Sequence, residues 1–259
     1  MDLKGSVAFV TGGGTGIGRA VVLGLARGGA KGIAVNYSRS ADEAEATAAE
    51  ARKLGAEAIA VQADIADEAQ VIQLVNGVEQ HFGGLDVLVN NAGTTRFIPA
   101  QDLDALTDEV WDSILGVNVK GTFYCSRAAA PALRKARGAI VNIASIAGLR
   151  ASGSSIPYMV SKAGVIHLSK ALALALAPDV RVNAVAPGLV ATRWFRVPFG
   201  DEGADAMETA SAAQTPLGEV ATPDHVAQVV LGLIGMDDVT GEVIVVDGGT
   251  HLTYGGYGR

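Results

Sequence analysis

The sequence contains a single cysteine, Cys125, among 259 residues. One cysteine excludes an internal disulfide and a cysteine-rich metal site. It lies among apolar residues of an expected helix, which is typical of an inert buried thiol. The histidines are also few and stand without the spacing of metal ligands, so we expect no metal site; they are His81, His167, His225 and His251.

Positive charge is scarce as well. Lysine and arginine number 20 against 27 acidic residues, which gives a net charge of −7. Such a balance argues against nucleic acid or an anionic membrane as the main partner. The most apolar helical stretch, 163–177, is interrupted by His167 and Lys170 and is not expected to span a membrane. The chain does not open on a basic segment followed by a long apolar run, so we expect a cytoplasmic protein.

Short apolar runs and helical stretches, by contrast, alternate along the whole chain. This alternation is the signature of βαβ units and predicts an α/β fold with a parallel sheet, formed by one domain over residues 1–259. Strands are expected at 7–10, 33–37, 58–62, 87–90, 139–144, 180–186 and 242–246. Helices are expected from 17 to the Gly28-Gly29 break and at 41–54, 67–82, 107–133, 155–177 and 223–236, with a polar segment at 188–221.

The chain is organised around residues 7–19, VAFVTGGGTGIGR. A fully apolar strand, 7–10, runs into a glycine-rich turn and then into a helix. A diphosphate approaches the main chain only where no Cβ intrudes, and the N–H groups of a new helix then face it. We therefore predict a dinucleotide-binding turn rather than a plain tight turn, with contacts from Gly12, Thr15, Gly16, Ile17 and Gly18.

The end of the second expected strand bears on the choice of coenzyme. Dinucleotide folds usually place an acidic residue there to hold the ribose hydroxyls, but this chain has Asn36, followed closely by Ser38 and Arg39. A carboxylate would repel a 2′-phosphate, whereas these residues are neutral or donate to it, so NADP is favoured over NAD. The alternative is that Asn36 only ends a strand and Arg39 is merely solvated.

Two later strand ends complete the expected coenzyme site. Asp64 follows the third strand and is placed to accept from the adenine amino group, with Ile65 beside it; alternatively, Asp64 caps the next helix. After the fourth strand, Asn91, Ala92 and Gly93 leave room for the coenzyme ribose. By itself, this stretch is also compatible with an ordinary turn.

The candidate catalytic residues are Ser145, Tyr158 and Lys162. The tyrosine and the lysine are four residues apart, so on a helix they share one face. A nearby ammonium and an oxidised nicotinamide lower the pKa of a phenol, which makes Tyr158 an acid for carbonyl reduction or a base for alcohol oxidation. Ser145 would hold the same substrate oxygen, and Asn118 would hold a water that links Lys162 to solvent.

Together these motifs resemble the short-chain dehydrogenase/reductase (SDR) family over essentially the full chain. The resemblance rests on TGGGTGIG at 11–18, NNAG at 90–93, NVKG at 118–121, Ser145, YMVSK at 158–162, PG at 187–188, Thr192 and VDGG at 246–249. It implies a doubly wound Rossmann sheet of seven parallel strands and a proton relay of Asn118, Ser145, Tyr158 and Lys162. It also implies that Lys162 holds the nicotinamide ribose, and that Pro187, Gly188, Val190 and Thr192 line the nicotinamide.

Within the family, the sequence is most similar to the 3-oxoacyl-acyl-carrier-protein reductase group. Family members usually pair through the two helices expected here at 107–133 and 155–177, whose apolar and small residues lead us to expect a homotetramer. The resemblance makes 188–221 a substrate lid, whose Trp194, Phe195 and Phe199 either line an apolar substrate wall or pack on a neighbouring subunit. An NAD-dependent alcohol, hydroxysteroid or sugar dehydrogenase and a non-catalytic NADP(H)-sensing regulator stay open as alternatives.

Docking of an acyl carrier protein is doubtful on the sequence. An acidic carrier needs a basic surface near the site, but the helix after Lys162 reads KALALALAPD and is nearly uncharged. Arg134, Lys135 and Arg137 would have to supply that surface instead. They are equally explained as a solvated helix end, where the helix dipole favours cations. We therefore expect a small carbonyl or alcohol substrate.

Overall fold

The computed structural model describes residues 1–253 and contains one seven-stranded sheet. The strands are β1 Val7–Val10, β2 Gly32–Tyr37, β3 Glu57–Gln62, β4 Val87–Asn90, β5 Ala139–Ile143, β6 Arg181–Pro187 and β7 Val243–Val246. Their order is β3-β2-β1-β4-β5-β6-β7, and every neighbouring pair is parallel. The central strands β1, β4 and β5 are buried along their whole length, as their mostly apolar runs predict. The expected doubly wound α/β fold is confirmed.

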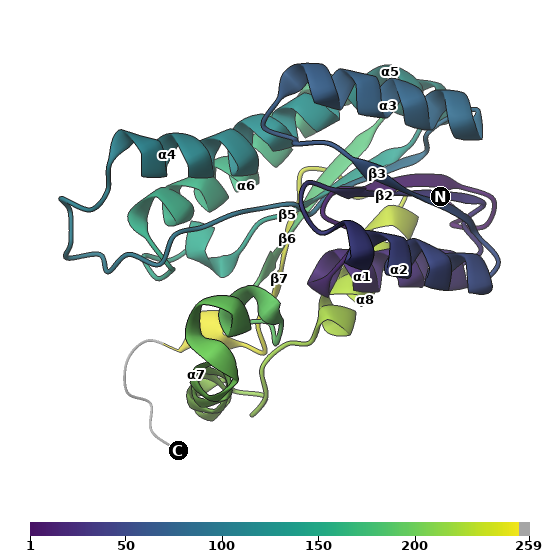
Figure 1. The fold of residues 1–259 in the computed structure, drawn as a ribbon. Helices are drawn as coiled ribbons and strands as arrows, with labels where there is room; N and C mark the ends of the chain where they lie inside the picture. Colours follow the sequence, from purple (N-terminus) through teal and green to yellow (C-terminus); the bar gives the residue numbers. More distant parts are fainter. Residues whose placement is uncertain (254–259) are drawn as a thin grey trace.

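Helices cover both faces of the sheet (Figure 1). On one face lie α1 Gly16–Arg27, α2 Ala41–Lys53 and α8 Pro223–Gly235; on the other lie α3 Glu68–Phe82, α4 Asp108–Leu115, α5 Thr122–Ala136 and α6 Ile156–Leu176. Each layer of helices packs on the sheet through its own apolar core. The two cores exclude water from both faces of the sheet. A ligand is therefore expected to bind at the carboxyl ends of the strands, where the sheet is not covered by helices.

The strand order reverses between β1 and β4, which are neighbours although two βα units separate them in the chain. Their carboxyl ends are tied together because the Thr11 hydroxyl accepts from the main-chain N–H groups of Asn91 (2.9 Å) and Ala92 (3.0 Å). Ligands of open α/β sheets bind in the crevice at such a switch point. The glycine-rich turn and the NNAG stretch are therefore brought to one place.

The helix expected at 107–133 is not uniform. Between α4 and α5, residues Gly116–Gly121 form a π-helical turn, which widens the helix where Asn118 lies. Single π turns inside helices are often found at functional sites, since the extra residue redirects a side chain. Helical periodicity predicts the helix but does not reveal this insertion.

The segment expected as a polar lid at 188–221 contains a helix that the sequence analysis did not assign, α7 Arg193–Gln214. It is bent at Gly200, whose φ of 72° is open to glycine and strained for other residues. Arg196 ties the two halves together through Asp201, Asp205 and Glu208. The break at Gly200 divides the helical pattern into pieces too short to stand out in the sequence.

Among the described residues, one helix, α6, is long and apolar enough to cross a bilayer by length and composition alone. The same helix packs along β6 and carries the buried ammonium of Lys162. Its length and composition are thus also those of a helix that packs on a sheet.

Candidate active site

The glycine-rich turn is shaped by close contacts that only glycine permits. A Cβ on Gly18 would lie 2.2 Å from the Gly12 carbonyl oxygen, and a Cβ on Gly12 would lie 3.1 Å from Ala92 Cα. The Asn91 side chain donates to the carbonyls of Thr11 and Gly12, both at 3.0 Å, and so fixes the turn. These two glycines therefore pack the turn against β4, while Gly16, with φ +52°, stands where α1 begins.

The first turn of α1 is left open toward the crevice. Its N-cap Thr15 makes no side-chain cap hydrogen bond, so the leading N–H groups of the helix, those of Gly16, Ile17 and Gly18, have no partner from the cap. Free amides at a helix N-terminus, in a turn lined by glycines, fit the diphosphate of a dinucleotide.

Asn36 makes contacts within the fold that the sequence does not reveal. Its side chain is buried, donates to the carbonyl of Ala63 (3.1 Å) and accepts from the N–H of Gly12 (3.4 Å). It therefore braces β2 against β3 and the glycine turn, and its amide is not free to donate to a coenzyme phosphate. No carboxylate stands at this strand end, so nothing there repels the 2′-phosphate of NADP.

Ser38 and Arg39 are exposed just beyond Asn36. Within residues 1–253, the Arg39 guanidinium has no ion pair and the Ser38 hydroxyl no hydrogen bond. A cation without a partner next to a hydroxyl, at the end of β2, fits the 2′-phosphate of NADP.

Asp64 is exposed after β3, and its carboxylate accepts from the Ala66 N–H at 3.0 Å. It closes a short turn and does not cap α3, whose N-cap is Asp67. The side chain of Ile65 is buried, and a Cβ on Gly121 would lie 2.9 Å from it. If Ile65 contacts a coenzyme, its main chain makes the contact, since its side chain is packed inside the protein.

The four candidate catalytic residues converge at the carboxyl ends of β4 and β5. Ser145 follows β5, and Tyr158 lies in the first turn of α6, where its N–H donates to the cap residue Ser155 (3.4 Å). Lys162 is buried, and its Nζ donates to the Ile143 carbonyl at 2.8 Å and lies 5.8 Å from the centroid of the Tyr158 ring.

Asn118 lies beside this group and is fully engaged by it. Its Nδ2 donates to the Thr94 carbonyl (3.0 Å) and to the Ser161 hydroxyl (2.9 Å), and its Oδ1 accepts from the Thr94 N–H (2.8 Å). Gly93 lies between the two side chains: a Cβ on Gly93 would lie 3.4 Å from Asn118 Oδ1 and 3.7 Å from Lys162 Nζ, both ordinary van der Waals distances. The side chain is thus occupied, and any water would be held by the Asn118 carbonyl, which already accepts from Thr122 (2.8 Å).

Burial changes the ionisation of the tyrosine and the lysine. It raises the pKa of Tyr158 to about 12, opposed by a side-chain hydrogen bond with Ser145. Burial also lowers the pKa of Lys162 to about 8. In the chain by itself the pKa of Tyr158 is therefore raised, because desolvation outweighs the hydrogen bond with Ser145; the expected lowering concerns the site with an oxidised nicotinamide bound. At neutral pH the phenol is protonated, as a proton donor must be.

The residues after β6 approach the same site. The Ser145 hydroxyl lies 3.5 Å from the Pro187 carbonyl, and a Cβ on Gly188 would lie 2.7 Å from Asp247 Cβ. Val190 is buried, and its main chain forms an isolated β-bridge with Ala221. Thr192 caps α7 by accepting from the Trp194 N–H at 3.3 Å.

Comparison with known proteins shows the family to which the chain belongs. The profile of the family described as enoyl-(acyl carrier protein) reductase matches residues 12–251. The chain is 37% identical over 249 residues to the 3-oxoacyl-acyl-carrier-protein reductase FabG of Staphylococcus aureus, covering 95% of this chain and 98% of that protein. The chain belongs to the short-chain dehydrogenase/reductase family. It is an oxidoreductase of the group that includes FabG.

Two further proteins are similar to this chain over nearly its full length. A Streptomyces violaceoruber protein assigned as ketoacyl reductase 2 of the granaticin polyketide synthase is 47% identical over 247 residues, which cover 95% of this chain and 96% of that one. The crystal structure of a short-chain dehydrogenase from Burkholderia cenocepacia in complex with NADP superposes with a TM-score of 0.87 at 37% identity, covering 97% and 100% of the two chains.

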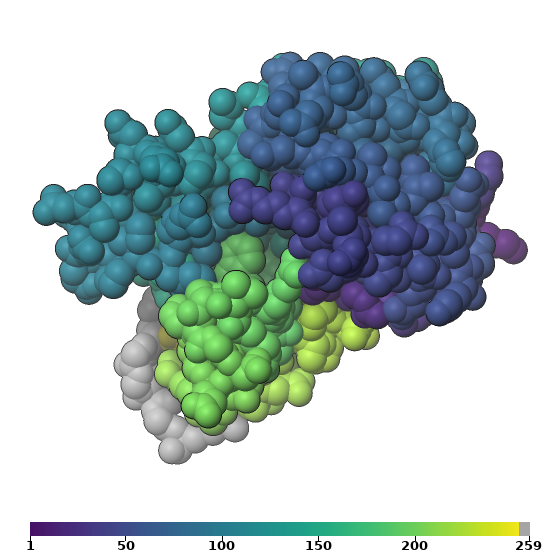
Figure 2. Space-filling model, in the orientation of Figure 1, coloured from purple at the N-terminus to yellow at the C-terminus, as the bar shows by residue number. Residues whose placement is uncertain are grey.

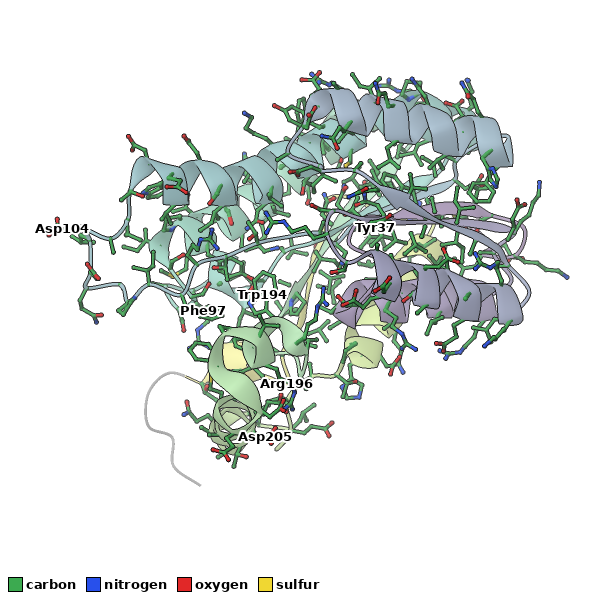
Figure 3. All side chains as sticks on the ribbon, viewed as in Figure 1. Tyr37, Phe97, Asp104, Trp194, Arg196 and Asp205 are labelled. Atoms are coloured by element: carbon green, nitrogen blue, oxygen red, sulfur yellow. The ribbon has the colours of Figure 1, made fainter. Side chains whose placement is uncertain are left out.

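Aromatic side chains of α7 and of the loop after β4 gather next to Tyr158; two of them, Trp194 and Phe97, are labelled in Figure 3. The rings of Trp194 and Tyr158 are 6.1 Å apart, centroid to centroid. Phe97, in the loop after β4, meets Phe199 at 4.8 Å and Phe195 at 6.0 Å. The aromatics of α7 therefore face the site within one chain, which favours the substrate-wall interpretation. Sequence reasoning missed Phe97, whose only signal is its position a few residues after NNAG.

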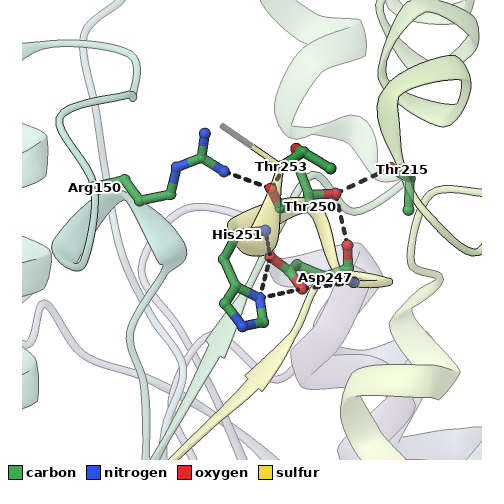
Figure 4. A network of polar contacts seen from close by, with 7 residues as sticks. Arg150, Thr215, Asp247, Thr250, His251 and Thr253 are labelled. Carbon is green, nitrogen blue, oxygen red and sulfur yellow. Dashed lines mark hydrogen bonds and ion pairs between the residues drawn. The ribbon is translucent and has the colours of Figure 1, made fainter. Parts of the chain in front are cut away.

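A polar network anchors the far end of α7 (Figure 4). Thr215, which follows the helix, contacts the hydroxyl of Thr250 at 3.0 Å, and Arg150, near Ser145 in the chain, donates to the Thr250 carbonyl at 2.7 Å. Asp247 is buried and lies 2.9 Å from the His251 ring. This network fixes the C-terminal end of α7. A recess separates α7 from the part of the molecule that contains the sheet (Figure 2).

Proposed function

We propose that this SDR reduces the 3-oxo group of small acyl thioesters and similar activated ketones with NADPH. The observation that carries the proposal is the convergence of a protonated buried Tyr158, Ser145 and Lys162 beside an open glycine turn. The relatives FabG and the granaticin ketoacyl reductase support a 3-oxoacyl substrate by their names. The NADP bound in the Burkholderia structure and the unpaired Arg39 support the coenzyme.

The chain's residues divide the reaction between them. The nicotinamide of NADPH, when bound, supplies the hydride to the carbonyl carbon. Tyr158 donates its hydroxyl proton to the carbonyl oxygen as charge develops there, and the Ser145 hydroxyl holds that oxygen in place. The Lys162 ammonium, held by the Ile143 carbonyl, stabilises the phenolate that remains. Asn118 fixes the π turn against the 94–95 loop and so holds the Lys162 side of the site rigid.

Coenzyme contacts are proposed for the residues placed around the crevice. The N-terminal amides of α1 hold the diphosphate, and Ser38 and Arg39 the 2′-phosphate. Asp64 faces the adenine. The ribose near the nicotinamide is held by Tyr158, Lys162 and the Asn91–Gly93 stretch, and the nicotinamide lies along Pro187, Gly188, Val190 and Thr192.

Turnover with a ketone and alcohol panel tests the proposal. We expect acetoacetyl and longer 3-oxoacyl thioesters of a small thiol to be reduced with NADPH. A 2-enoyl thioester serves as the matched control, because it offers a carbon–carbon double bond and no ketone for Tyr158 to protonate. NADPH binding without reduction of any ketone would instead support a coenzyme-sensing regulator, and enoyl reduction alone would contradict the assigned chemistry.

We further propose that a protein carrier adds little to substrate recognition. The cations at the end of α5 are partly committed, since Arg134 reaches the Ala175 carbonyl (3.5 Å) and Lys135 pairs with Glu79 (3.4 Å). Leu174, in the same region of α6, is 84% exposed and uncharged. With a net charge of −7, the protein has little to attract an acidic carrier. A tenfold preference in kcat/KM for a carrier-bound acyl group, lost at high salt, would contradict this.

The protein is proposed to act in the cytoplasm, where NADPH is available and where the single buried thiol is compatible with a reducing environment.

A further inference from the structure

Three consecutive residues at the start of α7 contact three different parts of the site. Thr192 Cγ2 lies 3.4 Å from where a Cβ on Gly16 would be, which places it over the glycine turn. Arg193 reaches across to the N-terminus of α2. Trp194 lies against the catalytic tyrosine, with ring centroids 6.1 Å apart. The beginning of the lid thus connects the diphosphate end, the adenosine end and the reacting end of the coenzyme crevice.

The Arg193 guanidinium is held by two groups of α2. Its Nη2 donates to the Ser40 hydroxyl and its Nη1 to Glu43 Oε1, both at 2.7 Å. Ser40 is the N-cap of α2, yet its side chain makes no cap hydrogen bond and faces Arg193 instead. An N-cap serine usually bonds its own helix, so its hydroxyl here serves the lid.

This contact lies next to the residues proposed for the 2′-phosphate. Ser40 directly follows Ser38 and Arg39 in the chain. A guanidinium carries five N–H donors, of which Ser40 and Glu43 use two, so donors remain for a further anion. Arg193 and Glu43 are each about half exposed, so both can adjust to a ligand.

We propose that Arg193 recognises the 2′-phosphate of NADP from the lid side and makes closure of the lid selective for NADP over NAD. The inference rests on the proposed function, since it concerns the coenzyme of that same site. A 2′-phosphate bound beside Arg39 would give the Arg193 guanidinium a second anionic partner, in addition to the Glu43 carboxylate. Because Trp194 is the next residue, an arginine held more firmly there also holds Trp194 against Tyr158.

Coenzyme binding by the Arg193→Gln variant tests the proposal without turnover. The change keeps a polar side chain but removes the charge. We expect the Kd for NADPH to rise about tenfold, because a charge-assisted contact to the phosphate is lost, while the Kd for NADH stays within twofold. Fluorescence titration measures both. Arg193→Lys keeps the charge and should recover most of the NADPH affinity.

Glu43→Gln is the matched control for the other half of the ion pair. It removes the carboxylate that competes for Arg193 and repels a phosphate, so NADPH should bind as tightly as in the wild type or more tightly. Limited proteolysis supplies a second readout: at equal saturation, NADPH should protect residues 193–214 better than NADH does, and this difference should vanish in Arg193→Gln.

Equal weakening of NADPH and NADH by Arg193→Gln would overturn the proposal and leave Arg193 as a lid anchor alone. Unchanged affinity for both would also overturn it. Either result is separate from failure of the proposed function, which would appear as a wild-type protein that binds NADPH but reduces no ketone.

Discussion

Tyr158 and Lys162 show how position changes the chemistry of a side chain. The two stand one helical turn apart on α6, and burial moves the pKa of one to about 12 and of the other to about 8. Near neutral pH the site therefore holds a neutral acid beside a cation. That combination suits reduction, in which the phenol gives up its proton and the ammonium stabilises the phenolate. Oxidation needs the phenolate first.

The rate of ketone reduction should depend on the charge of Lys162. With a pKa of about 8, Lys162 is an ammonium below pH 8 and loses its proton above it. We expect kcat/KM for reduction to be level between pH 6 and 7 and to fall about tenfold for each pH unit above 8, as the cation disappears. A pH–rate profile checks this. A profile that stays level to pH 10 would show that the charge of Lys162 does not matter.

Arg39 provides the test of coenzyme preference. It is exposed and unpaired within residues 1–253, so its removal should disturb no other contact. We expect Arg39→Ala to lose most of the preference for NADPH over NADH, about tenfold or more in relative Kd, because a charge-assisted contact to the 2′-phosphate is lost. Fluorescence titration measures the two constants. Arg52→Ala, which removes a cation paired with Glu45 elsewhere on α2, is the control and should change neither.

At the scale of elements, the strands and the glycine turn could be predicted from the sequence because each has a local cause. A buried parallel strand needs a short apolar run, and β1, β4 and β5 have one. The contact of Phe97 with α7 could not, because it joins residues far apart in the chain. The bent helix α7 could not, because the break at Gly200 divides its pattern into short pieces, and the π turn around Asn118 could not, because helical periodicity does not reveal an inserted residue. The contacts of Asn36 within the fold could not be predicted for the same reason as that of Phe97, since its partner Ala63 directly follows another strand, β3.

The contact between Phe97 and α7 predicts an effect on substrate binding. Phe97→Ala removes both ring contacts, with Phe195 and Phe199, that join the loop after β4 to α7. Aromatic pairs contribute about 0.5–1.5 kcal/mol each, so the loss of two pairs costs about 1–3 kcal/mol, and we expect KM for a 3-oxoacyl thioester to rise roughly 5- to 150-fold. The Kd for NADPH should stay unchanged. Steady-state kinetics check this, with Leu103→Ala, an exposed residue of the same loop, as the control. Equal effects of the two variants would contradict a lid contact.

At the scale of the whole molecule, apolar side chains remain uncovered on two long helices. Phe123 on α5 is 36% exposed, and Val160 and Leu174 on α6 are 47% and 84% exposed. Exposed apolar helix faces are a liability for aggregation, and partner subunits are the natural cover. We therefore predict a homotetramer, in which α5 and α6 lie between subunits.

Light scattering checks the assembly directly. At micromolar concentration we expect a mass of four times the 26.3 kDa of one chain. Leu174→Glu places a charge in the predicted interface and should shift the mass downward, whereas Leu54→Glu, on an exposed position after α2, should not. A wild-type mass near that of one chain would contradict the prediction.

The central claim is that Tyr158 donates the proton in an NADPH-dependent ketone reduction, and Tyr158→Phe tests it most directly. The variant keeps the ring that packs near Trp194 and removes only the acidic hydroxyl. Steady-state reduction of acetoacetyl thioester is measured together with the Kd for NADPH. We predict that kcat/KM falls by about 10²–10⁴-fold, the typical loss of a general acid, while the Kd for NADPH stays within twofold. Turnover within a few-fold of the wild type would contradict the account.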